Sequence, residues 1–283
     1  MTVRDYFLPR TLPEALGLLE GHGPELLVVA GGTVAMPLIN EGISLPDAVM
    51  GLRLAGLDRL ERAGDTLRIG ATATLTQLLD QDAVPMLREA ARNTASWSVR
   101  NMATVGGNLF TPPPGGDVAV ALLALDATVT LASARHERVL QLGEFLTGFM
   151  SNALAADELL VEIRVPIRSG PTAYLKLGRK HASTPAVVTV AVRLGWHEGR
   201  VADARIALGA VGPHPIRARA AEQILVGSGL NADAIASASV AAARECNPFT
   251  DGIATDWYRR RMAGLFVRRA LEQLAPRARG EGR

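Results

Sequence analysis

The chain has a single cysteine, Cys246, among its 283 residues. One thiol can form no disulfide within the chain, which is typical of proteins from a reducing compartment. A cysteine-ligated zinc ion or iron–sulfur cluster is excluded as well, because each of these needs several thiolates. Cys246 itself is expected to be a small apolar filler on a helix.

Long apolar runs are also lacking. The N-terminal residues "MTVRDYFLPR" contain no apolar core of signal-peptide length. The longest apolar candidate, "VAVALLALDATVTLA", is interrupted by Asp126 and is too short to span a bilayer. We therefore expect a cytoplasmic protein without a transmembrane segment.

Aromatic residues make up only 4% of the chain, and the formal net charge is only +2. Much of the positive excess lies in the C-terminal stretch "RRMAGLFVRRALEQLAPRARGEGR", where aromatic residues that would stack on bases are not interleaved with it. This pattern favours a solvated helix face over a nucleic-acid surface. His181, His197 and His214 are too scattered to predict a metal site.

The pattern of elements predicts an α+β protein. A helix over 11–23 is expected from Thr11 and Glu14 at capping-box spacing. After a candidate linker at 169–172, three apolar strand patterns precede helical stretches at 218–226, 232–245 and 255–274. Strands followed by segregated helices indicate α+β architecture, and no βαβ alternation is evident. We predict domains at 1–168 and 173–275, with a disordered tail at 276–283.

Two glycine pairs stand out, in "VVAGGTVAMPL" (28–38) and "ATVGGNLFTPPPGGD" (103–117). A glycine pair after a strand can expose consecutive backbone N–H groups as a concavity for an anion. Neither pair has a lysine or arginine beside it, so a phosphate would be held by amides, as suits a buried pyrophosphate. Neither stretch matches GxGxxG or a P-loop. Each pair taken alone is more simply a tight turn between strands.

The sequence around these pairs resembles that of the FAD subunits of molybdenum hydroxylases. "VVAGGT" resembles their first flavin-binding stretch, and "VRNMATVGGNL" followed by "GD" and "LLALDATV" resembles their second. The C-terminal stretches "IALGAVGPHPIRARAAEQILVG" and "PFTDGIATDWYRRRMAGLFVRRAL" are similar to the family's last domain. This family includes the carbon monoxide dehydrogenase medium subunit and the FAD domain of xanthine dehydrogenase. The resemblance extends from about Tyr6 to Leu274. It implies a two-part FAD-binding domain of the PCMH/vanillyl-alcohol-oxidase-like type, split near residue 56, and a C-terminal domain of antiparallel sheet plus helices.

The resemblance also implies the residues that bind FAD in this chain. They are Val28, Val29, Ala30, Gly31, Gly32, Thr33, Val34, Ala35, Thr104, Val105, Gly106, Gly107, Asn108, Asp117, Leu160 and Lys176. The first loop is expected around the pyrophosphate. Asp117 would accept from a hydroxyl of the FAD, or else cap a turn. Leu160 would contact the cofactor through its backbone or be strand core, and Lys176 would lie near the flavin ring or be an exposed strand lysine. Val34 and Ala103 depart from the family's usual residues.

The function implied is electron transfer. In this family FAD connects an iron–sulfur partner, which moves single electrons, to a terminal acceptor. The 2Fe-2S clusters and the molybdenum cofactor are expected on a small and a large partner subunit, as a dimer of heterotrimers, and no catalytic residue is expected in this chain. Two alternatives stay open: a self-contained flavoprotein dehydrogenase or oxidase, and a non-enzymatic assembly subunit that has lost FAD. The substrate and the terminal acceptor are not encoded in these motifs.

Overall fold

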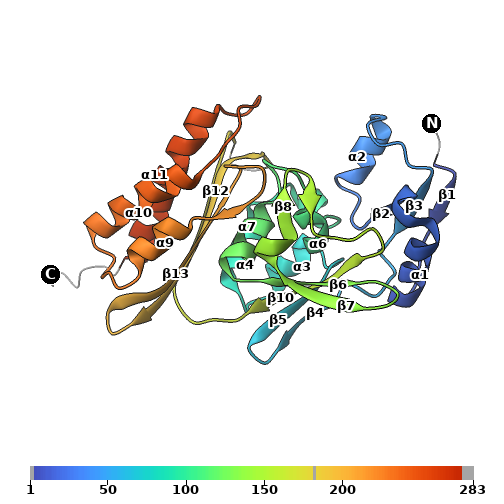
Figure 1. The fold of residues 1–283 in the computed structure, drawn as a ribbon, viewed down its shortest axis with the longest axis horizontal. Helices are drawn as coiled ribbons and strands as arrows, with labels where there is room; N and C mark the ends of the chain where they lie inside the picture. The colour runs from blue at the N-terminus through green and yellow to red at the C-terminus, as the bar shows by residue number, and fades with distance from the viewer. Residues whose placement is uncertain (1–2, 181–182, 276–283) are drawn as a thin grey trace.

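The computed structural model describes residues 3–180 and 183–275. Its first part is a small parallel sheet in the order β1-β3-β2, with α1 packed on it (Figure 1). The elements are β1 (Asp5–Phe7), α1 (Leu12–His22), η1 (Gly23–Glu25), β2 (Leu26–Val29), α2 (Ala35–Asn40) and β3 (Ala48–Gly51). The expected absence of βαβ alternation is wrong here, because parallel strands are joined by helices. Strands of three or four residues are too short to show a period in the sequence.

The middle of the chain is a five-stranded antiparallel sheet, ordered β4-β5-β10-β6-β7, with helices packed on one face. Its strands are β4 (Leu60–Ala63), β5 (Thr66–Gly70), β6 (Thr128–Ala132), β7 (Glu137–Gln141) and β10 (Leu159–Pro166), with a small hairpin of β8 (Leu146–Gly148) and β9 (Ser151–Asn152). Its helices are α3 (Leu75–Asp80), α4 (Pro85–Arg92), α5 (Trp97–Arg100), α6 (Val105–Leu109), α7 (Asp117–Ala124) and α8 (Leu142–Phe145).

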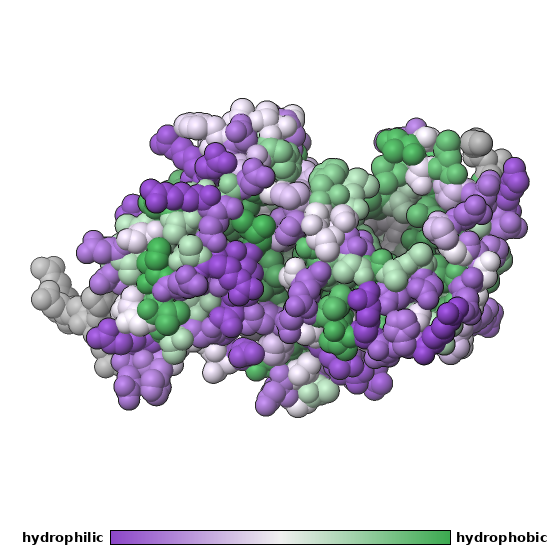
Figure 2. Space-filling view, viewed as in Figure 1, coloured by the Kyte–Doolittle hydropathy of each residue, from purple (hydrophilic) through white to green (hydrophobic). Residues whose placement is uncertain are grey.

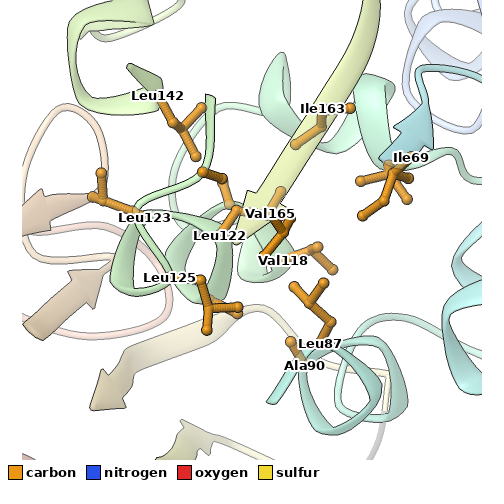
Figure 3. Packing of buried hydrophobic residues seen from close by; sticks show 14 of the residues in the cluster. Ile69, Leu87, Ala90, Val118, Leu122, Leu123, Leu125, Leu142, Ile163 and Val165 are labelled. Carbon is orange, nitrogen blue, oxygen red and sulfur yellow. The ribbon is translucent and has the colours of Figure 1, made fainter. Parts of the chain in front are cut away.

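Helix α7 is the centre of this part, since every one of its residues is buried. Its Val118 packs in one cluster with Leu87 of α4 and Val165 of β10 (Figure 3). A helix that is apolar all round must be covered on all sides. The C-terminal sheet also covers α7, and Gly209 of that sheet leaves room for Val120 of the helix. A Cβ at Gly209 would lie 2.4 Å from Val120 Cγ2.

The C-terminal part is a four-stranded antiparallel sheet with three helices on the face away from α7 (Figure 1). The elements are β11 (Thr172–Gly178), β12 (Ala186–His197), β13 (Arg200–Gly209), β14 (Ile216–Arg217), α9 (Arg219–Leu225), α10 (Ala232–Glu245) and α11 (Asp256–Leu274). The α+β class is confirmed, including the antiparallel sheet with helices at the C-terminus. Cys246 is buried in this part, directly after α10.

Two expectations fall outside this description. The predicted tail at 276–283 and the scattered histidine His181 lie outside the described residues. Within the described ranges, no helix combines the length and the apolar character that a membrane crossing requires.

Candidate functional site: a cleft where three parts of the chain meet

A cleft of about 730 Å³ lies between the three parts of the molecule. One wall is the end of β2 and the loop before α2, a second is formed by the loops around α6 and α7, and a third by residues 183–185 and Ile253. Figure 2 shows the surface hollowed beside α2, with apolar side chains at the rim. The volume is in the range of sites for small molecules and cofactors.

The first glycine loop presents unpaired backbone donors to this cleft. Gly32 has a φ of +70°, a conformation that glycine adopts without steric cost. The amides of the four residues from Gly31 to Val34 donate to no partner within residues 3–180 and 183–275. They lie between the end of β2 and the start of α2, where helix geometry also leaves N–H groups unsatisfied. Such consecutive N–H groups attract an anion.

Gly31 lies where the first loop meets another part of the main chain. A Cβ at this position would lie 1.9 Å from the carbonyl oxygen of Met102. The first loop therefore touches the segment that leads into the second loop, and only a residue without a side chain fits between them. The two loops contact each other at this point, and the cleft is lined by both.

The second glycine pair differs from expectation. It is not an open turn, because Gly106 and Gly107 lie inside the short helix α6. The amide of Gly106 donates to Ala71 O at 2.9 Å, and the amide of Gly107 donates to Thr104 Oγ1 at 3.0 Å. The amides of Val105 and Asn108 are also used, by Ala73 O and Thr104 O. The expectation that both loops offer free amides to a diphosphate is therefore wrong for the second loop.

Asn108 fixes the second loop to α7. Its Oδ1 accepts from the amides of Val118 and Ala119 at 3.0 and 3.2 Å, which satisfies two donors at the start of that helix. The side-chain nitrogen of Asn108 has no hydrogen-bond partner in the described part of the chain. Asn108 lines the cleft, so this amide group is the one polar donor that α6 adds there.

Asp117 and Lys176 form a buried ion pair. Lys176 Nζ lies 2.6 Å from Asp117 Oδ2 and 3.0 Å from Asn93 O, and Thr189 donates to Asp117 Oδ1 at 3.0 Å. The two side chains are only 6% and 7% exposed. Burial raises the pKa of Asp117, and the contacts with Lys176 and Thr189 oppose that rise. Sequence reasoning placed both residues at the site but did not predict that they pair with each other.

Glu158 is the other charged residue in the cleft lining, which contains no lysine or arginine among the described residues. Its carboxylate accepts from Arg138 Nε and Nη2, both at 2.7 Å, and from the amide of Ala155 at 2.8 Å. The hydrogen bond from Arg138 lowers the pKa of Glu158 below its ordinary value. Both carboxylates of the cleft are thus already paired with cations.

The structure brings most of the predicted residues together. Fourteen of the sixteen line the cleft, and the exceptions are Val105 and Lys176. Val105 is fully buried in the core, and Lys176 lies behind Asp117. Sequence reasoning missed several lining residues that come from turns and from the C-terminal part: Thr94, Ala95, Phe110, Thr111, Pro112, Thr184, Pro185 and Ile253. The proline run after the second loop is the one local signal that could have indicated some of them.

Comparison with known proteins decides the family. A family described as "FAD binding domain in molybdopterin dehydrogenase" matches residues 2–168, and "CO dehydrogenase flavoprotein C-terminal domain" matches residues 172–274. The chain belongs to the molybdopterin dehydrogenase FAD-binding family. The resemblance seen in the sequence motifs is thereby confirmed.

Relatives of this family match along nearly the whole chain. The caffeine dehydrogenase subunit beta of Pseudomonas sp. (strain CBB1) is 32% identical over 98% of this chain and 96% of that protein. The carbon monoxide dehydrogenase medium chain of Afipia carboxidovorans is 31% identical over 97% of each chain. The solved structure of reconstituted CO dehydrogenase from Oligotropha carboxidovorans superposes with a TM-score of 0.92 at 32% identity, covering 97% of this chain and 98% of that one.

The family assignment confirms two further predictions. The chain is an oxidoreductase component whose cofactor is FAD, and its function is that of an electron-transfer subunit of a molybdenum hydroxylase.

Proposed function

We propose that the cleft holds FAD with its diphosphate against the first loop. The observation that carries this proposal is the row of four unpartnered amides, Gly31 to Val34, at the end of β2 and before α2. Backbone donors at such a position stabilise phosphate without a paired cation. The lack of lysine and arginine in the described lining accords with a diphosphate held by amides.

The other predicted residues complete the proposed site. Thr104, Gly106, Gly107 and Asn108 form the opposite wall, and Leu160 lies beside them on β10. FAD supplies the ability to take up electrons singly and release them as a pair. The chain's own residues bind and orient the cofactor. Asp117 and Lys176 contribute by fixing the start of α7 to β11.

We propose that partner subunits supply the remaining redox centres. A small subunit would carry the 2Fe-2S clusters and a large one the molybdenum cofactor, assembled as a cytoplasmic dimer of heterotrimers. The single cysteine supports this division, because the chain cannot ligate a cluster. The domain bounds 1–168 and 173–275 are proposed as the division between the flavin-binding part and the C-terminal part.

A self-contained flavoenzyme is disfavoured by the cleft's chemistry. Such an enzyme needs an acid, base or electrophile that is free to act on a substrate. The titratable side chains in the described lining are Asp117 and Glu158, and both are held in ion pairs. An electron-transfer subunit needs no such group.

The test is FAD binding by the purified chain and by two matched glycine variants. Gly32 and Gly64 both have positive φ, of +70° and +60°, but only Gly32 lines the cleft. Alanine at either position costs about 1–2 kcal/mol of backbone strain. We expect the wild-type chain to show the absorbance of bound flavin, Gly32→Ala to bind FAD at least about tenfold more weakly, and Gly64→Ala to bind normally. A wild-type chain that stays colourless at saturating FAD, or equal binding by both variants, would contradict the proposal.

A further inference from the structure

Arg259 is completely buried in the C-terminal part, which is rare for a charged side chain. It lies one turn into α11, after the N-cap Thr255. A guanidinium is always charged, so its burial is tolerated only where acceptors and an anion surround it. The groups that accept hydrogen bonds from Arg259 therefore show which segments it holds in place.

The acceptors come from three separate segments, at residues 186–187, at Ala210 and at Asp251. Arg259 Nη1 donates to Ala186 O and Val187 O at 3.1 and 2.9 Å, and to Ala210 O at 3.1 Å. Arg259 Nη2 donates to both carboxylate oxygens of Asp251, at 2.8 and 2.9 Å. The guanidinium carbon also lies 4.8 Å from the centre of the Phe249 ring.

Two of these three segments lead directly into the cleft. Residues 183–185, which immediately precede Ala186, line it, and so does Ile253, two residues after Asp251. Asp251 in turn accepts from the amides of Ile253 and Ala254, at 2.9 and 3.0 Å. One side chain thus connects the two pieces of the cleft's third wall to helix α11.

We infer that Arg259 is a positioning residue for the flavin site, fixing the wall that the C-terminal part contributes through residues 183–185 and Ile253. This inference rests on the proposed FAD cleft. Arg259 does not itself line the cleft, and it acts through the backbone of these segments. Holding these segments together requires the several N–H donors of a guanidinium, because Arg259 reaches three carbonyl groups and a carboxylate at once.

The decisive variant is Arg259→Lys in the full chain, which keeps the charge but not the guanidinium. We expect it to fold, to bind FAD about tenfold more weakly, and to change the visible circular dichroism of the bound flavin. Arg268→Met is the matched control on the same helix. The Arg268 side chain is 59% exposed and among the described residues pairs only with Glu272, so FAD binding should stay normal. Asp251→Asn is the second variant and is expected to weaken FAD binding while Arg259 is retained.

The outcomes separate this inference from the proposed function. The Arg259→Lys variant could lose stability but keep the wild-type affinity for FAD and the wild-type circular dichroism of the flavin. That result would show a role in folding alone and overturn the inference. If Arg259→Lys does not fold, Asp251→Asn decides: weaker FAD binding supports the inference and unchanged binding overturns it. If the wild-type chain and Arg268→Met both fail to bind FAD, the proposed function is overturned, and so is the inference that rests on it.

Discussion

Gly31 is the residue on which the contact between the two glycine loops depends. The carbonyl of Met102 occupies the space where a side chain would project, and a carbonyl of the main chain cannot turn aside as a flexible side chain can. The two loops come from different parts of the chain, so this contact joins the parallel sheet to the middle sheet.

We predict that Gly31→Ala destabilises the chain by about 1–3 kcal/mol, as overpacking does elsewhere. Gly17 is the control, because it lies within α1 and a Cβ there would meet nothing within 4 Å. Alanine at Gly17 should stabilise the chain by about 0.5–1 kcal/mol. Urea unfolding of both variants measures the difference, and equal stability of the two would show that the loops are not in contact.

Among the helices and strands, α7 and β11 are joined by a buried ion pair. Asp117 opens α7, Lys176 lies on β11, and both side chains are nearly inaccessible. Removing one member of a buried pair leaves the other charge uncompensated, and this costs more than removing both. The pair therefore connects α7, which begins at the cleft, to the C-terminal sheet.

We predict that Lys176→Met lowers the free energy of unfolding by about 3–5 kcal/mol. The double variant with Asp117→Asn should be destabilised by less than the sum of the two single variants. A double-mutant cycle with denaturant unfolding provides the coupling free energy. Strict additivity would mean that the two groups do not interact.

Sequence patterns predicted the elements with strong local signals. The helices expected at 11–23, 232–245 and 255–274 are observed at 12–22, 232–245 and 256–274, and Thr11, Asn231 and Thr255 cap them through their side chains. Helix α6 was missed because two glycines disfavour a helix. It is held instead by the carbonyls of Ala71 and Ala73, which lie far from it in the sequence.

The candidate site was predictable where it is continuous along the chain and not where it depends on distant partners. The two loops and Asp117 follow from motifs, and they line the cleft. The pairing of Asp117 with Lys176 joins residues 59 positions apart, and the third wall comes from residues 183–185 and Ile253. Neither has a local pattern, because both arise from how the C-terminal sheet packs on α7.

At the scale of the whole chain, a further set of charges at Asp126, in the turn after α7, joins the middle part to the C-terminal sheet. Its carboxylate accepts from Arg205 Nε at 2.8 Å and from Arg217 Nη1 at 2.8 Å, both from the C-terminal sheet. Burial acts to raise the pKa of Asp126, but the two arginines outweigh it and the pKa is lowered from 3.8. The ionised carboxylate is therefore favoured in the folded state.

A lowered pKa fixes the sign of the pH dependence. The stability that Asp126 contributes is present above its unfolded pKa and is lost as the pH falls through the folded value, below about 3.8. We predict that Asp126→Asn is destabilised at neutral pH and loses less stability than the wild type on acidification. Asp82→Asn, at a side chain that is 82% exposed, should keep the wild-type profile. Unfolding at a series of pH values measures this, and parallel profiles for wild type and Asp126→Asn would refute it.

The position of the cleft between three parts of the chain has a consequence for stability. FAD bound as proposed would contact all three parts, and by mass action its occupancy would add about 2.7 kcal/mol when free ligand is 100 times Kd. In the chain without FAD this contribution is absent, while the core shared by α7 and the C-terminal sheet still joins the middle and C-terminal parts. The proposed FAD would thus contribute to the stability of the fold as well as carry electrons.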